Sequence, residues 1–208
     1  MSIYITPPFR MSFPSLFVPT GYLDGPKKYS VTALWSVDDL KTTHKEAWKT
    51  LLTAMDAKAK EFFDTPLARL PANIRRGIRN GNEKEHLNGY GEGILFASLS
   101  TDRKPQVVDL SKVLIPDGDT QRIYPGAYAR ASVNVFAYDN IGKGVALGLH
   151  NVQWLGHGER LDSVTAATDD FAEDPDAHWF AAAEESVDTD EEQSVAEDPN
   201  DFADDIPF

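Results

Sequence analysis

The chain has 208 residues, of which 41% are hydrophobic, and this is enough for a folded core. It contains no cysteine, which excludes a disulfide framework, a cysteine-ligated zinc site and a thiol nucleophile. No apolar run approaches the about 20 residues of a membrane span, and the N-terminus lacks the basic and apolar regions of a secretory signal. We therefore expect a soluble, cytoplasmic protein that contacts no membrane.

The net charge of −13 is the sum of two unlike parts. All 20 Lys and Arg lie between Arg10 and Arg160 beside 16 Asp and Glu, which gives this part a net charge of +4. Leu161 to Phe208 holds 17 acidic residues and no basic ones. This asymmetry is typical of a polyanion-binding domain with a separate interaction arm. We expect a folded domain over residues 1–162 and a disordered acidic tail over residues 163–208.

The first predicted elements are two strands and a helix. Phe9 to Val18 is a strand interrupted by Pro14, so it lies at an edge or carries a bulge. Tyr29 to Trp35 alternates apolar and polar residues after a Gly-Pro turn. Apolar residues then recur at helical spacing from Leu40 to Phe63, with Asp38 or Asp39 as the cap and Pro66 as the stop.

The second half of the predicted domain consists of strands. Leu67 to Asn88 is rich in Arg, Gly and Asn, which predicts a long basic loop. Strands follow at Gly93 to Leu99 and Gln106 to Asp109, and Tyr128 to Tyr138 forms a hairpin with Val145 to Trp154. Five or six short strands with one inserted helix predict a mainly β fold, a small closed or partly open barrel.

The strand before the hairpin turn has two unlike faces. Small apolar residues alternate from Ala127 to Ala137 and suit the interior of a tight barrel. The other face combines aromatic rings, one arginine and small polar groups, namely Tyr128, Arg130, Ser132, Asn134, Phe136 and Tyr138. Bases of a single strand stack on such rings while arginine meets phosphate. The alternative is that the helix covers these rings as a second core.

Basic residues supply the second requirement for nucleic-acid binding. They lie mostly in turns and at polar strand positions, where an oligonucleotide-binding barrel holds its ligand. Arg75, Arg76 and Arg79 stand within five residues and repel one another unless an anion neutralises them. The other candidates are Arg10, Lys28, Lys104 and Arg130.

The last five residues resemble the tip of bacterial single-stranded DNA-binding proteins. They are Asp204, Asp205, Ile206, Pro207 and Phe208. In that family the tip follows a disordered acidic tail and docks into an apolar pocket of partner proteins. Phe208 suits such an anchor because it loses few rotamers on binding, and the aspartates steer it toward basic partners.

The body resembles a phage family of single-stranded DNA-binding proteins with an oligonucleotide-binding (OB) fold. The matching stretches are residues 9–13, 104–109, 124–128 and 135–140, with a continuation from Gly144 to Asp162. The resemblance implies a five-stranded Greek-key barrel that binds single-stranded DNA in phage replication, recombination or repair in the bacterial cytoplasm. Its stretches add Tyr124 to the candidate DNA-contacting residues. The acidic tip implies recruitment of phage or host replication and recombination proteins. The sequence does not decide between a monomer and a homodimer.

No motif supports catalysis. The chain has no phosphate-binding loop, and its glycine-rich stretch at Gly89 to Gly93 precedes a strand instead of following one. His150, His157 and Glu159 form the one conceivable metal trio, with a spacing unlike a helical zinc site. We therefore expect no catalytic residue, metal or cofactor. The alternative is a Mg²⁺-dependent nucleic-acid-processing enzyme or nuclease accessory protein, and a weaker one is an acidic mimic of DNA.

Overall fold

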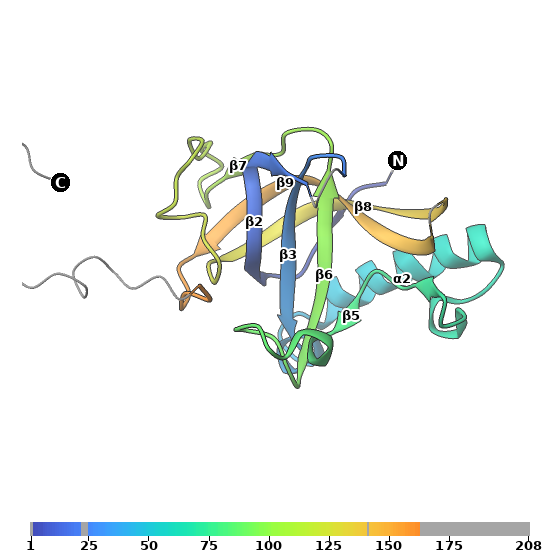
Figure 1. Ribbon diagram of the computed structural model, residues 1–208. Coiled ribbons are helices and arrows are strands. Elements are labelled where there is room, and N and C mark those ends of the chain that lie inside the picture. Colours follow the sequence, from blue (N-terminus) through green and yellow to red (C-terminus); the bar gives the residue numbers. More distant parts are fainter. Residues whose placement is uncertain (1, 22–24, 141, 163–208) are drawn as a thin grey trace, which may run out of the picture. The chain divides into compact units, whose positions relative to one another are not determined.

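The computed structural model describes residues 2–21, 25–140 and 142–162, whose strands form one closed barrel (Figure 1). The barrel strands are β2 (Phe9–Thr20), β3 (Lys28–Ser36), β6 (Ile94–Thr101), β8 (Tyr128–Asp139) and β9 (Lys143–Gly156). They pair in the order β2-β3-β6-β9-β8, and β8 pairs back to β2. All pairs are antiparallel except β6 with β9. This is the predicted five-stranded OB topology.

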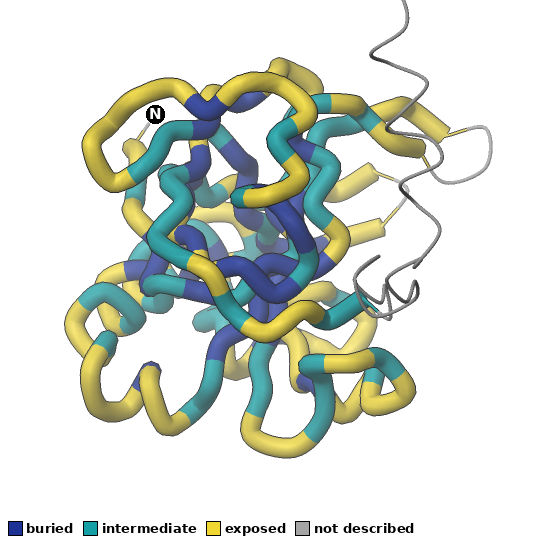
Figure 2. The backbone as a smooth tube through the Cα atoms, turned by 90° about the vertical axis from the view of Figure 1, so that its left-hand side faces the viewer, coloured by how far each residue is buried: buried dark blue, intermediate teal, exposed yellow. Residues whose placement is uncertain are grey.

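The barrel interior follows the predicted alternation of β8. Ala127, Ala129, Ala131 and Val133 are almost completely buried, and they face apolar residues from the other four strands. Figure 2 shows the buried positions gathered inside the strands, with exposed loops around them. Small side chains on β8 let the neighbouring strands approach closely, because a barrel of five strands has little interior volume.

β2 carries the bulge that Pro14 predicts. Its register against β3 shifts between Ser12 and Ser15, and Phe13 between them has a φ of 47°. The extra residue turns the Phe13 side chain into solvent, where 57% of it is exposed.

The predicted single helix is wrong in one respect, because it is broken into α1 (Val37–Lys41) and α2 (Lys45–Phe63). The N-cap is Ser36, whose Oγ accepts the Asp39 N–H at 3.5 Å, so neither Asp38 nor Asp39 is the cap. The break lies at Thr42, whose backbone leaves the helical region at φ −108° and ψ −86° and whose hydroxyl donates to the Asp38 carbonyl at 2.7 Å.

α2 packs under the barrel with a conventional amphipathic face. Leu51, Met55 and Ala59 are fully buried, and Trp48 lies 5.5 Å from Trp35 between ring centres. Among the described residues, no helix combines the length and apolar character that crossing a membrane requires.

The region predicted as a long basic loop contains short elements that tie it to the barrel. These are η1 (Leu67–Arg69), β4 (Ile74–Arg75), β5 (Arg79–Asn80) and η2 (Gly81–Lys84). β4 runs parallel to β9, and β5 pairs antiparallel with β6. The loop prediction failed because two-residue strands are too short to give a periodic pattern. As a result, the arginines are held by backbone pairing at both ends.

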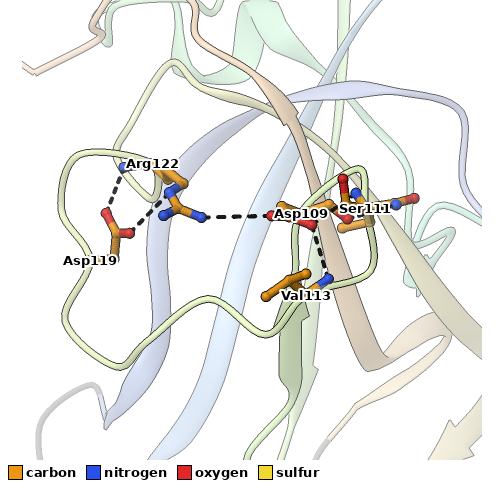
Figure 3. A network of polar contacts seen from close by, with 6 residues as sticks. Asp109, Ser111, Val113, Asp119 and Arg122 are labelled. Atoms are coloured by element: carbon orange, nitrogen blue, oxygen red, sulfur yellow. Dashed lines mark hydrogen bonds and ion pairs between the residues drawn. The ribbon is translucent and has the colours of Figure 1, made fainter.

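Two further strands extend the sheet. β1 (Tyr4–Ile5) pairs with β8, and β7 (Gln106–Val108) runs parallel to β9. The loop after β7 is ordered by Asp109, which accepts the Ser111 and Val113 N–H groups at 2.8 and 3.0 Å (Figure 3). Arg122 joins this turn to Asp119, because its Nη1 lies 4.0 Å from the Asp109 carboxylate and its Nε lies 3.2 Å from the Asp119 carboxylate.

The described chain ends in a segment fastened across the outside of the barrel. We call residues 157–162 the C-terminal strap. The Leu161 N–H donates to the Pro125 carbonyl at 2.9 Å, and an Arg10 Nη donates to the Glu159 carbonyl at 2.6 Å. The Arg160 guanidinium lies 4.7 Å above the Tyr124 ring. The strap is therefore part of the folded body, although it has no regular secondary structure.

Candidate nucleic-acid interface

The outer face of β9 near the hairpin turn has only very small residues of its own, and the Tyr138, Arg75 and Asn134 side chains cover its glycines. Gly144, Ala146 and Gly148 alternate with the buried Val145, Leu147 and Leu149. Their partners across the hairpin are Tyr138, Phe136 and Asn134. A strand without outward side chains allows a neighbouring group or a ligand to approach the backbone closely.

Larger side chains of β8 lie over and beside these small residues. Phe136 is 39% exposed, and its ring centre lies 6.2 Å from that of Tyr138. A Cβ atom at position 144 would lie 2.8 Å from the Tyr138 hydroxyl oxygen, so the tyrosine reaches across β9. Phe136 and Tyr128 are both exposed, so the alternative that the helix covers the β8 rings as a second core is wrong for these two rings.

Arg75 meets Tyr138 at the same point. β4 pairs Arg75 with Gly144, and the Cβ position above that glycine is 3.0 Å from the Arg75 Cβ. Within the described residues, Arg75 forms no ion pair and is exposed to solvent. The backbone and Cβ of Arg75 thus lie beside the Tyr138 hydroxyl, although the two residues come from separate elements.

A basic pocket of about 580 Å³ continues from Arg75. Arg75, Arg76 and Arg79 all line it, so the structure brings together the arginines that the sequence singles out. Arg76 donates to the Leu70 carbonyl at 2.8 Å, and Arg79 pairs with Glu83 through its Nε at 2.9 Å. Of the residues that the structure describes, Glu83 is therefore the one carboxylate that lines the pocket beside three arginines. The pocket keeps an excess of positive charge, so it attracts an anion.

Beyond the pocket, two cations rest on the outer surface of β6. The Arg79 guanidinium lies 5.0 Å from the Phe96 ring centre, and the Lys84 Nζ lies 5.3 Å from it. Lys84 is also 5.6 Å from the Tyr90 ring, which packs edge-on against Phe96. Cation–π contacts restrict these side chains while leaving their charge available to a phosphate.

Tyr90 links this cluster to the neighbouring strands. Its hydroxyl donates to the Ser12 Oγ at 3.1 Å, which connects it to β2. Burial raises the pKa of Tyr90, so its hydroxyl stays protonated near neutral pH. Sequence reasoning missed Tyr90, Phe96 and Lys84 as site residues. The alternation of side chains along β6 could have indicated Phe96, because it places this residue on the face opposite Leu95, Ala97 and Leu99.

These residues form one continuous surface, which we call the basic-aromatic interface. It runs from the end of the β8–β9 hairpin across β4 and β5 to the outer side of β6. Its members are Arg75, Arg76, Arg79, Lys84, Tyr90, Phe136 and Tyr138, and the buried Phe96 ring supports Arg79 and Lys84 from beneath. The third barrel strand and the turn between the fourth and fifth strands are regions that OB folds use for oligonucleotides.

Other predicted DNA-contacting residues lie outside this surface. Tyr128 and Arg10 share a pocket near the opposite end of β8. The Arg130 Nε donates to Gln153 at 2.8 Å. Lys28 pairs with Asp102 at 3.4 Å, and Lys104 pairs with Asp117.

Tyr124 is the predicted residue whose environment differs most from the expectation. It is only 6% exposed, and its hydroxyl donates to the Gly158 carbonyl at 3.0 Å. Arg160 covers its ring. Tyr124 therefore anchors the strap in this arrangement and has no free ring face for a base. The five residues of the predicted tip lie outside the described residues.

The metal trio considered from the sequence does not form a cluster. His157 contacts the Tyr124 hydroxyl through Nδ1 at 3.2 Å. Among the described residues, no group of three or more His, Asp or Glu side chains is arranged to hold a metal ion.

The barrel topology defines an OB-fold protein, and the basic-aromatic interface lies on its outer side. Residues 2–181 match the family described as "Enterobacter phage Enc34, ssDNA-binding protein". The chain belongs to this family of phage single-stranded DNA-binding proteins, as the sequence resemblance predicts.

Relatives and solved structures agree with this assignment. The chain is 30% identical to protein p50 of Acyrthosiphon pisum secondary endosymbiont phage 1 over 157 residues, or 72% of this chain and 81% of p50. The single-stranded DNA-binding protein of bacteriophage Enc34, solved in complex with ssDNA, aligns with a TM-score of 0.63 at 22% identity, covering 76% of this chain and 88% of that one.

A second phage protein shares the fold more distantly. The single-stranded DNA-binding protein gp2.5 of bacteriophage T7 aligns with a TM-score of 0.50 at 16% identity, covering 84% of this chain and 99% of gp2.5. At these identities, the two structural matches support the barrel fold and leave the roles of individual residues to the geometry of this chain.

Proposed function

We propose that this chain binds single-stranded DNA without sequence preference through the basic-aromatic interface. Family membership supports the ligand, and one contact supports the location. Tyr138 and Arg75 come from separate elements and meet above Gly144, where the Tyr138 hydroxyl oxygen and the Arg75 Cβ both lie close to the point that a side chain at position 144 would occupy. Such a pair matches the base and the phosphate of one nucleotide.

Single-stranded DNA fits this surface better than duplex DNA. The rings of Phe136 and Tyr138 offer apolar contact area, and bases expose their faces for stacking only when they are unpaired. Stacking does not depend on base identity, and phosphate contacts carry no sequence information. The interface therefore binds most sequences with similar affinity.

The proposal includes a division of labour along the chain. Residues 1–162 bind DNA, and residues 163–208 recruit replication and recombination proteins of the phage or its host through Asp204 to Phe208. The chain acts without catalysis in phage DNA replication, recombination or repair, in the cytoplasm of the bacterial host. The charge difference between the two parts of the sequence supports this division.

The opposite charges of the two parts also imply competition. The 16 acidic residues of residues 163–208 are tethered to the body and are attracted to the same cations as a phosphate backbone. Deleting residues 163–208 should tighten DNA binding at low ionic strength, and the difference should shrink as salt is added. Unchanged or weaker binding of the shortened chain at low salt would contradict the competition.

A titration tests the central function. Fluorescein-labelled oligo-dT is titrated with the full chain, and anisotropy should saturate at a fixed ratio of protein to DNA. A parallel incubation with Mg²⁺ should leave the strand intact. Failure to saturate contradicts DNA binding, whereas Mg²⁺-dependent cleavage would favour the alternative of a nucleic-acid-processing enzyme.

The tip needs a separate experiment. Deleting Phe208 should preserve the anisotropy titration and abolish capture of replication proteins from a lysate of the host. Capture at the level of the full chain would contradict the proposed role of the tip.

A further inference from the structure

A second pocket lies near the opposite end of β8 from the hairpin turn. It has a volume of about 240 Å³ and is bounded by the start of β2, the end of β3, α1 and Tyr128. Drug-sized ligands occupy pockets of about 300–1,000 Å³, so this one suits a smaller group. The residues that matter here are Arg10, Leu34, Asp39, Leu40, Ile94 and Tyr128.

The walls of this pocket suit a flat ligand. Tyr128 is 41% exposed and offers its ring, while Leu34 is buried and supplies apolar surface together with Ile94 and Leu40. A planar ring system gains most from such walls when it stacks on the tyrosine and covers the aliphatic side chains.

The polar groups of the pocket are of opposite kinds. The Arg10 Nε is buried and has no hydrogen-bond partner among the described residues, while one Nη is held by the Glu159 carbonyl. A buried donor without an acceptor is costly, and a ligand acceptor would relieve that cost. Asp39 also lines the pocket and forms no ion pair in the described part of the chain, so it supplies an acceptor. A neutral ligand with donors and acceptors on its edge satisfies both residues.

The position of the pocket connects it to the basic-aromatic interface. Leu34, which lines it, is the register partner of Phe96 across β3 and β6. The pocket therefore begins one strand away from the ring that carries Arg79 and Lys84. A DNA strand that follows the outer side of β6 would reach this pocket.

We propose that this pocket takes a single nucleobase, turned out of the bound strand and stacked on Tyr128 beside Arg10. The inference rests on the proposed function, because the base belongs to the same DNA strand. A nucleobase has apolar faces and an edge of donors and acceptors, which matches the walls and the two polar side chains.

The absence of cysteine from the chain allows a direct test. Asp39→Cys places a unique thiol at the pocket, and its alkylation by a maleimide is followed in the full chain. Saturating oligo-dT should slow alkylation at least about tenfold. Glu61→Cys, on the exposed side of α2, is the matched control and should be unaffected. Equal alkylation rates with and without DNA at position 39 would overturn the proposal.

Two further measurements separate a base from a passing phosphate. An abasic oligonucleotide with the same backbone, saturating by anisotropy, should leave the thiol at position 39 unprotected. Tyr128→Ala should weaken oligo-dT binding about 5- to 150-fold, the range expected for one stacked base. Phe62→Ala, which removes a half-exposed ring near the end of α2, is the control and should not weaken binding. Full protection by the abasic strand, or unchanged affinity of Tyr128→Ala, would overturn the base pocket. If the unmodified chain does not bind oligo-dT at all, the proposed function fails instead.

Discussion

The hydroxyl oxygen of Tyr138 lies above Gly144, 2.8 Å from the point that a Cβ atom at position 144 would occupy. The ring can reach across β9 because the residue beneath it has no side chain. This places an aromatic group from β8 against Arg75 of β4, two strands away in the sheet. The glycine therefore joins the ring and the charge into one surface.

Phe136→Ala should weaken oligo-dT binding without unfolding the protein. The ring is 39% exposed, so its removal leaves no core cavity, and the melting temperature should change by only a few degrees. Loss of one stacked base should lower affinity about 5- to 150-fold. Anisotropy titration and thermal melting measure the two effects. A large drop in melting temperature would instead assign Phe136 a structural role.

Arg75→Gln should reduce the dependence of DNA binding on salt. Each phosphate contact to a single strand contributes about 0.7 to the slope of log K against log salt, so the slope should flatten by about that amount. Lys58→Gln is the control, because Lys58 pairs with Glu61 on α2, away from the interface. An unchanged slope for Arg75→Gln would remove this residue from the DNA contacts.

Glu83→Gln should tighten DNA binding several-fold. Glu83 accepts from Arg79 within the basic pocket, so it competes with a phosphate for the same guanidinium group. The amide keeps the shape of the side chain and removes the competing charge. Glu61→Gln changes the net charge equally but acts on Lys58 of α2, and it should have little effect. The proposal for Arg79 fails if both variants bind alike.

The C-terminal strap should determine where the chain can be shortened. A chain ending at residue 162 should melt at nearly the temperature of the full chain. One ending at residue 156 loses the contacts of Leu161 and Gly158 to Pro125 and Tyr124. Each hydrogen bond contributes about 0.5–1.5 kcal/mol net, so the melting temperature should fall by roughly 5 °C or more. Equal melting temperatures would show that the strap is dispensable.

Alternation predicted the barrel strands well because their two faces have different environments. On β8, Ala129, Ala131 and Val133 face the barrel core, while Tyr128 and Phe136 face solvent. The helix break could not be read from periodicity, because Leu40 keeps its buried position on α1 while Thr42 interrupts the backbone.

Part of the interface was beyond sequence reasoning for a related reason. The arginines at positions 75, 76 and 79 are visible as a charge cluster, but their partners are set by pairing between distant segments. Phe96 meets Arg79 only because β5 pairs with β6 at that register. Tyr124 was predicted to contact DNA but is buried by the C-terminal strap. The strap has no periodic sequence pattern, so this contact could not be predicted from the sequence.

Photo-crosslinking most directly tests whether the basic-aromatic interface holds the DNA. Oligo-dT carrying 5-iodouracil is bound to the full chain, irradiated and digested, and the modified peptides are identified by mass spectrometry. Crosslinks should fall on peptides containing Phe136, Tyr138 or Tyr90, and Arg75→Gln should reduce them. Crosslinks confined to α2, or to the loop of residues 109–122, would contradict the proposed location.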